Sequence, residues 1–176
     1  MTTLLGISGA LRKDSRNTAL ISEAARLFAP DEFVMADLRL PLYDGDLEDS
    51  AGIPDAVHTL HAQIKAADAI VISTPEYNKN LSGVLKNALD WLSRVRPQPW
   101  AGKPVAIVSA ASGRAGGERA QYSLRHCMTP FNPRILQGPE IMIATADNAF
   151  DDDGRLVNEF STKSLTKLMD ALRAEI

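Results

Sequence analysis

The chain has little of what would place it in several large classes of protein. Its 176 residues contain one cysteine, Cys127, so no internal disulfide can form and nothing indicates a disulfide-stapled secreted scaffold. The longest apolar runs, such as Ala69–Ile72 and Val105–Val108, are far shorter than the roughly 18 residues that cross a bilayer. We therefore expect no membrane partner.

An excess of charge of one sign is also missing. Lysine and arginine total 19 against 22 aspartate and glutamate residues, which gives a formal net charge of −3. A nucleic-acid partner would require a broad basic face, so this balance argues against one. The N-terminal residues lack the charged, long apolar and small-residue regions of a signal peptide, so we expect a cytoplasmic protein.

Short β-rich runs alternate with longer stretches of helical periodicity. Three of the β-rich runs are continuously apolar, which is typical of strands covered on both faces. The alternation predicts an α/β fold with one doubly wound, five-stranded parallel sheet and helices on both faces. The length fits one domain, residues 1–176. The predicted strands are Thr3–Ser8, Glu32–Asp37, Ala69–Thr74, Pro104–Ala110 and Ile135–Thr145; the predicted helices are Asn17–Phe28, Ile53–Ala67, Ser82–Val95, Gly117–Met128 and Val157–Ala174, with turns at Tyr43–Gly52 and Asp151–Gly154.

In such a sheet, ligands bind at the carboxyl ends of the strands, near the point where strand order reverses. The loop after the first predicted strand, within Gly6–Leu20, contains serines, a threonine, an asparagine and Arg12 just before a helix begins. Free N–H groups and the helix dipole favour an anion there. The loop lacks the spacing of a nucleoside-triphosphate or dinucleotide loop, so it predicts a phosphate monoester site. The alternative is that Ser15 or Asn17 only caps the helix, with Arg12 and Lys13 solvated.

The loops after the third and fourth predicted strands reach the same edge. In the first of them, Pro75 restricts the path of the chain, and Tyr77 and Asn78 could serve the face and the polar edge of a planar heteroaromatic ring. The other loop, Ser109–Gly117, has three glycines that let the backbone approach a flat ligand. Ordinary strand-to-helix connections remain the alternative for both. Glu76 suits loop structure or an interchain contact better than a reduced ring.

Together the three loops resemble the NADPH-dependent FMN reductase family, a flavodoxin-like group. The most specific motif is Pro-Glu-Tyr-Asn followed by Gly-x-Leu-Lys-Asn-Ala-x-Asp-Trp, which ends at Trp91; the first loop departs from the usual Gly-Ser opening because it reads Ser8-Gly9. The resemblance implies that the FMN phosphate contacts the first loop, that the isoalloxazine lies on the second, and that the third closes its other side. The implied FMN-binding residues are Ser8, Arg12, Ser15, Asn17, Thr18, Ala19, Pro75, Glu76, Tyr77, Asn78, Ser109, Gly113 and Gly116.

The resemblance also implies an activity. Hydride passes from NADPH or NADH to FMN and then to a small acceptor: a quinone, an azo compound, a metal oxyanion or free flavin. FMN carries this chemistry, so we expect no catalytic side chain and no metal. The resemblance implies a homodimer or homotetramer, with the helix Ser82–Val95 as the candidate contact and its Trp91 in the core or the subunit interface. A 2′-phosphate on the co-substrate would need a further cation, for which Arg114, Arg119 and Lys79 stay open.

Two other functions fit parts of the pattern. A flavodoxin-type electron carrier would bind FMN without oxidising a nicotinamide, although such carriers are usually far more acidic. A low-molecular-weight phosphatase would need a cysteine in the first loop, whereas the chain's cysteine is at position 127. Three further residues, His58, His61 and His126, are expected to be solvated or packed rather than metal ligands.

Overall fold

The computed structural model describes all residues, 1–176, and contains a parallel β-sheet of order β2-β1-β3-β4-β5, with β6 beside β4. Strand order reverses between β1 and β3, as in flavodoxin-like sheets, which confirms the predicted doubly wound fold. The strands are β1 (Thr3–Ser8), β2 (Glu32–Met35), β3 (Ala69–Thr74), β4 (Pro104–Ala110), β5 (Arg134–Ile135) and β6 (Ile141–Ile143). The helices are α1 (Arg16–Phe28), α2 (Gly45–Ala51), α3 (Asp55–Ala66), α4 (Gly83–Leu92), α5 (Glu118–Met128) and α6 (Glu159–Arg173), with 3-10 turns η1 (Thr129–Phe131) and η2 (Ala146–Asn148).

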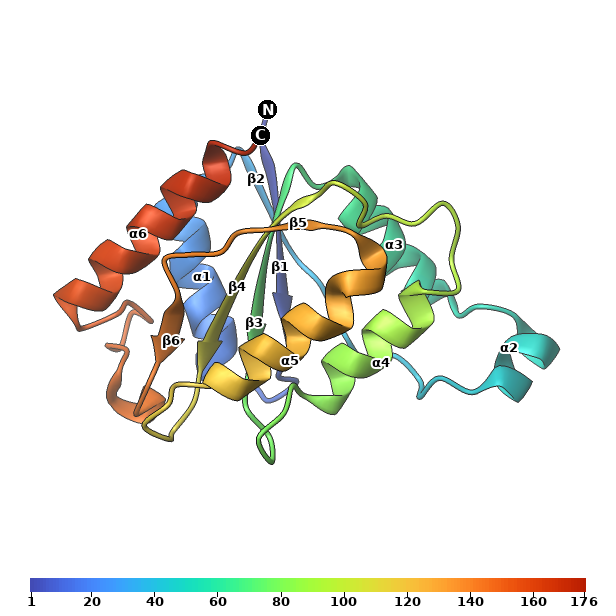
Figure 1. Cartoon of the computed structure of the whole chain (residues 1–176), viewed down its shortest axis with the longest axis horizontal. Helices are drawn as coiled ribbons and strands as arrows, with labels where there is room; N and C mark the ends of the chain where they lie inside the picture. Colours follow the sequence, from blue (N-terminus) through green and yellow to red (C-terminus); the bar gives the residue numbers. More distant parts are fainter.

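Helices cover both faces of the sheet, α1 and α6 on one and α3, α4 and α5 on the other (Figure 1). Successive strand residues point to opposite faces, so each central strand contributes to two apolar cores. In β3, for example, Val71 packs with α1 and α6, whereas Ile70 and Ile72 pack with the helices of the opposite face. This explains why the central strands have no polar alternation in the sequence.

The predicted fifth strand, Ile135–Thr145, is wrong as one continuous element. Both β5 and β6 pair with β4, but β4 advances three residues from Val105 to Val108 while its partner advances six from Ile135 to Ile141. Pro139, within the extra residues, has no backbone N–H to donate, so the ladder cannot continue through it. The strand therefore leaves the sheet and returns.

The predicted turn at Tyr43–Gly52 is also wrong, because it contains α2. Asp44 caps this helix through a hydrogen bond that its side chain accepts from the N–H of Asp46. None of the helix residues is buried, so the helix has no apolar stripe that could reveal it.

Helix α4 packs its apolar stripe inside the chain. Trp91 is fully buried and its indole N–H donates to the Pro41 carbonyl at 2.8 Å, and Leu92 is 1% exposed. Of the two alternatives for these residues, the structure shows the core. A subunit contact through α4 would therefore have to use its polar side.

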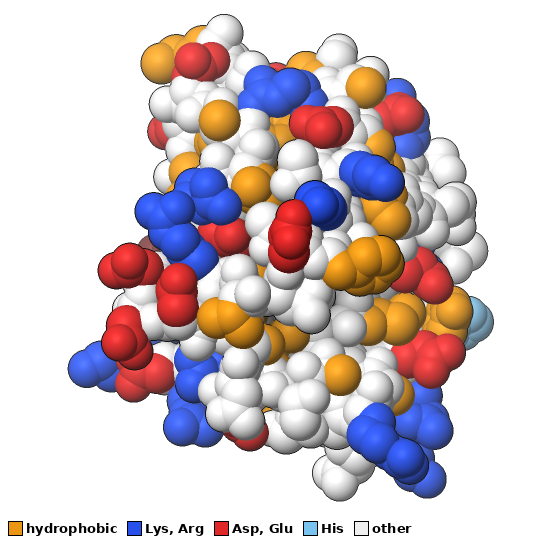
Figure 2. All heavy atoms as spheres, turned by 90° about the vertical axis from the view of Figure 1, so that its left-hand side faces the viewer, with side chains coloured by type: hydrophobic (Ala, Val, Ile, Leu, Met, Phe, Trp, Pro, Cys, Tyr) orange, Lys and Arg blue, Asp and Glu red, His pale blue; other side chains and the backbone are white.

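The surface has no single dominant charge on the face that carries α6. Figure 2 shows basic and acidic side chains interspersed there, with scattered apolar ones between them. No helix of the chain is long and apolar enough to span a membrane.

Candidate functional site

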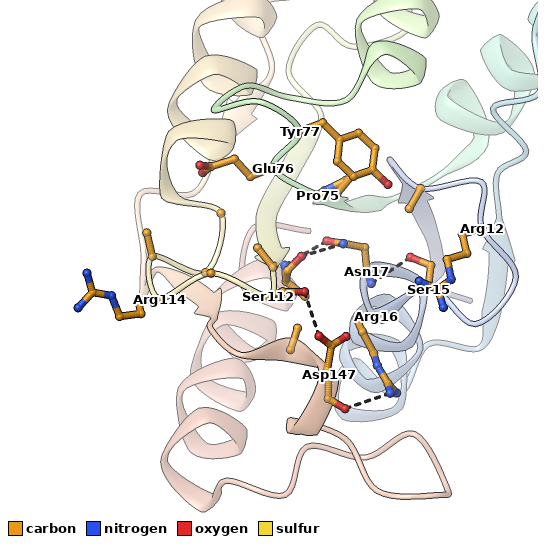
Figure 3. A pocket seen from close by; sticks show the side chains of 18 of the residues that line it. Arg12, Ser15, Arg16, Asn17, Pro75, Glu76, Tyr77, Ser112, Arg114 and Asp147 are labelled. Carbon is orange, nitrogen blue, oxygen red and sulfur yellow. Dashed lines mark hydrogen bonds between the residues drawn. The ribbon is translucent and has the colours of Figure 1, made fainter.

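A cleft of about 650 Å³ lies at the carboxyl ends of β1, β3 and β4 (Figure 3). This volume is in the usual range for a pocket that holds one cofactor or drug-sized ligand. Its walls come from the three predicted loops and from η2, which the sequence analysis did not include. The lining residues are Ala10, Arg12, Asp14, Ser15, Arg16, Asn17, Pro75, Glu76, Tyr77, Ala110, Ala111, Ser112, Gly113, Arg114, Ala115, Gly116, Gly117, Arg119, Ala146 and Asp147.

The first loop offers the cleft a row of free backbone donors. The N–H groups of residues 11–16 donate to no other group of the chain, although four of these residues line the cleft. They lead into the first residue of α1, a helix of 13 residues, and Ser15 caps its N-terminus by accepting from the N–H groups of Asn17 and Thr18. Exposed Arg12 adds a cation beside them. Unpaired N–H groups, a helix N-terminus and a guanidinium form a donor set suited to a phosphate.

Ser8 and Thr18 have partners within the protein. Their hydroxyl groups are 2.9 Å apart and share a hydrogen bond that joins the end of β1 to the first turn of α1. Neither residue lines the cleft, and Ala19 lies beyond it on α1, against the core that α1 shares with α6. The structure thus assigns these three a place behind the loop, and their contact with a phosphate stays a prediction.

Asn17 is 4% exposed and connects three elements. Its Nδ2 donates to the carbonyl of Ala110 at 2.9 Å, and its Oδ1 accepts from the N–H of Ala110 at 3.1 Å and from Ser73 Oγ at 2.8 Å. Ser73 and Ala110 lie at the ends of β3 and β4, where the other two loops begin. One side chain therefore fixes the roots of all three loops relative to one another (Figure 3).

The second loop presents Tyr77 at the cleft. Tyr77 and Asn80 exchange backbone hydrogen bonds of 3.1 and 3.2 Å, and Asn78 and Lys79 between them have φ of 52° and 68°. This is the geometry of a tight hairpin turn with left-handed central residues, which asparagine tolerates well. Tyr77 is 54% exposed, so its ring is available to a ligand, whereas Asn78 lies in the turn and does not line the cleft.

Glu76 lines the cleft, but its carboxylate is engaged. It accepts from the backbone N–H of Arg119 at 3.1 Å, in the first turn of α5, and lies 3.5 Å from the Arg119 guanidinium. A carboxylate at a helix N-terminus is favoured by the dipole. Of the alternatives for Glu76, the structure supports loop structure. The hairpin is braced a second time, since Ser123 Oγ donates to Asn80 Oδ1 one helical turn further along α5.

The backbone conformation of the third loop requires glycine at two positions. Gly116 and Gly117 have φ of 60° and 94°, and a Cβ on either would lie within 2.7 Å of Met142 or Ser109. Ser109 is fully buried outside the cleft, where its Oγ donates to the Gly116 carbonyl at 2.6 Å and accepts from Gln121 at 2.8 Å. Gly113 lines the cleft with open space around it. The backbone requirement is therefore at 116 and 117; Gly117 belongs to the predicted loop but was not among the implied FMN-binding residues.

Sequence reasoning missed a contact that closes the floor of the cleft. The Arg16 guanidinium donates to the carbonyl of Asp147 at 3.1 Å, and Ser112 Oγ donates to the Asp147 carboxylate at 3.0 Å (Figure 3). Asp147 comes two residues after the end of the predicted fifth strand, whose carboxyl end reaches the same sheet edge. Its position after a strand was the signal that could have found it.

The structure therefore gathers most of the predicted residues, but not all. Those that line the cleft are Arg12, Ser15, Asn17, Pro75, Glu76, Tyr77, Gly113 and Gly116; those that do not are Ser8, Thr18, Ala19, Asn78 and Ser109. No group of three or more His, Cys, Asp or Glu side chains could hold a metal ion. Away from the cleft, His61 Nε2 bonds the Pro97 carbonyl at 2.7 Å.

Comparison with known proteins places these loops in a family context. Residues 2–148 match the profile of the NADPH-dependent FMN reductase family. The chain is 45% identical to an NAD(P)H-dependent FMN reductase of Pseudomonas aeruginosa, over 97% of this chain and 92% of that one. It is 38% identical to a quinone reductase of Escherichia coli, with the same coverage. The solved structure of FerB, a flavoenzyme NAD(P)H:(acceptor) oxidoreductase from Paracoccus denitrificans, superposes with a TM-score of 0.86 at 34% identity, covering 98% of this chain and 95% of that one.

Proposed function

The chain belongs to the NADPH-dependent FMN reductase family, and we propose that the cleft at its sheet edge binds FMN and admits first the nicotinamide and then a small electron acceptor. As a member of this family the protein is an oxidoreductase that depends on FMN and on NADPH or NADH. When bound, FMN supplies the ability to accept a hydride and to pass its electrons to a second substrate. The protein's own residues bind the FMN, orient it and shield it.

The observation that carries the proposal is the set of unpaired N–H groups at residues 11–16 beside Arg12. A phosphate monoester carries nearly two negative charges and several acceptor oxygens, so it needs convergent donors and partial neutralisation. This end of the cleft provides both. Ser15, through its hydrogen bonds to the N–H groups of Asn17 and Thr18, holds the helix N-terminus in place behind them.

The other end of the cleft suits a flat ring. Pro75 and Tyr77 form one wall, and the backbone from Gly113 to Gly117 forms another in which small residues leave the main chain accessible. In our proposal these walls hold the isoalloxazine so that a nicotinamide stacks in reactive geometry. Positioning of this kind supplies most of the rate in a reaction between two bound rings.

For the acceptor we propose a quinone. The cleft is open at Tyr77, whose half-exposed ring offers a planar aromatic molecule a stacking surface. The Escherichia coli relative, named a quinone reductase, supports this class, because its 38% identity extends over nearly the whole chain. Azo compounds, metal oxyanions and free flavin are the competing acceptors.

The test is anaerobic reduction of the FMN-loaded protein. We expect NADPH or NADH to bleach the visible flavin absorbance, and benzoquinone to restore it, while FMN without protein responds far more slowly to the nicotinamide. If neither nicotinamide bleaches the flavin, the protein is a flavodoxin-type carrier. If bleaching occurs but benzoquinone restores the absorbance no faster than dichromate or an azo dye, the quinone assignment is wrong.

The remaining parts of the proposal concern the whole chain. We propose that residues 1–176 act as one FMN-binding domain in the cytoplasm, where an unpaired Cys127 is ordinary. We also propose a homodimer or homotetramer, supported by exposed large apolar side chains such as Tyr77, Tyr122 and Leu42. Light scattering after gel filtration tests this, since a mass of 19.1 kDa would identify a monomer.

A further inference from the structure

Four arginines line the cleft, and they differ in what holds them. Arg16 is anchored on the carbonyl of Asp147, and Arg119 lies against the carboxylate of Glu76. The side chains of Arg12 and Arg114 make no hydrogen bond or ion pair with the rest of the chain, and both residues are exposed. Two guanidinium groups at the cleft are thus free to meet a ligand.

The two free guanidinium groups lie far apart. Figure 3 shows Arg12 and Arg114 on opposite sides of the cleft, with Asn17 and Tyr77 between them. Arg12 belongs to the loop with the unpaired N–H groups, where the proposed function locates the FMN phosphate. Arg114 belongs to the loop after β4, beside the proposed ring, and extends outward at the rim. A single phosphate monoester cannot reach both.

Arg114 is therefore available to a second anion, and the co-substrate carries one. A cleft of about 650 Å³ has room for one cofactor-sized ligand, so a dinucleotide stacked by its nicotinamide must leave its adenosine part outside the rim. Resting on the proposed function, we infer that Arg114 binds the 2′-phosphate of NADPH and makes the enzyme prefer NADPH to NADH. A guanidinium suits this role because its planar donors bind a phosphate in a bidentate manner.

The structure also distinguishes Arg114 from Arg119 and Lys79, the other two cations that the sequence offered for a 2′-phosphate. Arg119 is already opposed by Glu76, whose carboxylate also accepts from the Arg119 backbone N–H in the first turn of α5. Lys79 lies at the tip of the Tyr77–Asn80 hairpin and does not line the cleft. Only Arg114 among the three combines a place at the rim with an uncompensated charge.

The experiment compares Arg114→Ala and Arg114→Lys with the wild-type, FMN-loaded protein. Because the Arg114 side chain has no partner within the chain, its removal leaves the fold intact. Lys167→Ala is the matched control: it removes one exposed cation from α6, on a helix that contributes nothing to the cleft. Each variant is assayed for kcat/KM with NADPH and with NADH. Calorimetry then gives the Kd of two probes, adenosine 2′,5′-bisphosphate and adenosine 5′-monophosphate.

In the wild type we expect kcat/KM to be higher for NADPH. Arg114→Ala should lower the NADPH value about tenfold and leave the NADH value unchanged, the loss of one exposed charge-assisted contact. The bisphosphate should bind about tenfold more weakly and the monophosphate equally well, with Arg114→Lys intermediate. The wild-type preference should also shrink as salt screens the contact.

Other outcomes would overturn the assignment. Equal losses with NADPH and NADH would mean that Arg114 contacts the pyrophosphate common to both. An unchanged NADPH-to-NADH ratio, or equal binding of the two probes by wild type and Arg114→Ala, would mean that it contacts neither. Oxidation of neither nicotinamide would instead defeat the proposed function, and the probe titrations would still report on Arg114.

Discussion

Replacement of Asn17 by alanine should destabilise the protein more than the loss of so few side-chain atoms suggests. The change removes three hydrogen bonds and leaves Ser73 Oγ and both backbone groups of Ala110 without that partner. At about 1 kcal/mol for each hydrogen bond, the free energy of unfolding falls by about 3 kcal/mol. The higher helix propensity of alanine offsets at most about 0.7 kcal/mol of this fall. We expect a net loss of about 2.5 kcal/mol. Because Ala110 borders the cleft, water can reach it and keeps the loss from being larger.

Urea denaturation of the FMN-free protein measures this loss as a shift in midpoint at constant slope. Ser22→Ala, which removes an exposed hydroxyl from the same helix, is the control and should change the free energy of unfolding by less than about 0.5 kcal/mol. Ser73→Ala removes one of the three bonds, so with Asn17→Ala it should show a coupling energy of about 1 kcal/mol. If Asn17→Ala costs no more than Ser22→Ala, Asn17 does not hold the loop roots together.

Three further changes test the loops and the surface. Gly117→Ala forces a side chain into φ of 94° and places a Cβ 2.7 Å from that of Ser109, so it should cost about 3 kcal/mol in urea denaturation, whereas Gly45→Ala, with nothing within 4 Å, should cost nothing. Arg12→Ala should weaken FMN binding about tenfold by fluorescence titration but leave riboflavin, which has no phosphate, unaffected. Desolvation, followed by the hydrogen bond to Glu48, raises the pKa of Tyr43. The contribution of this shift to folding stability is therefore complete below the ordinary tyrosine pKa of about 10 and is lost as pH rises through the folded-state pKa. Tyr43→Phe should flatten that decline of stability at alkaline pH.

The sequence predicts the part of the fold that burial controls. Strands β1, β3 and β4 have the predicted bounds and contain the chain's apolar runs, because both faces of each strand pack against helices. Elements that burial does not control were missed. Helix α2 depends on the Asp44 cap and has no fully buried residue, and the detour between β5 and β6 contains Pro139, which cannot donate to the ladder.

For the site, sequence reasoning located the loops but not the direction of each side chain. A polar residue in a strand-to-helix loop can face the ligand or the protein, and the residue type does not decide which. Asn17 was predicted to contact a phosphate, yet both ends of its amide are bound to the ends of β3 and β4. Ser109 likewise faces Gln121 and the Gly116 carbonyl. Such partners come from residues far away in the chain, so only the folded arrangement reveals them.

Pairing within the protein is what separates structural from ligand-facing charges at this cleft. Glu76 and Arg119 are paired with each other at the start of α5. The Arg16 guanidinium donates to the carbonyl of Asp147, whose carboxylate in turn accepts from Ser112. A charge engaged in this way gains little from a ligand, because binding would have to break an existing contact. The guanidinium groups of Arg12 and Arg114 incur no such loss, so the free energy of a new phosphate contact goes entirely into binding. In our proposal the cleft therefore has two anion-binding ends, Arg12 at the one that receives the monophosphate cofactor and Arg114 at the one that receives the phosphorylated dinucleotide.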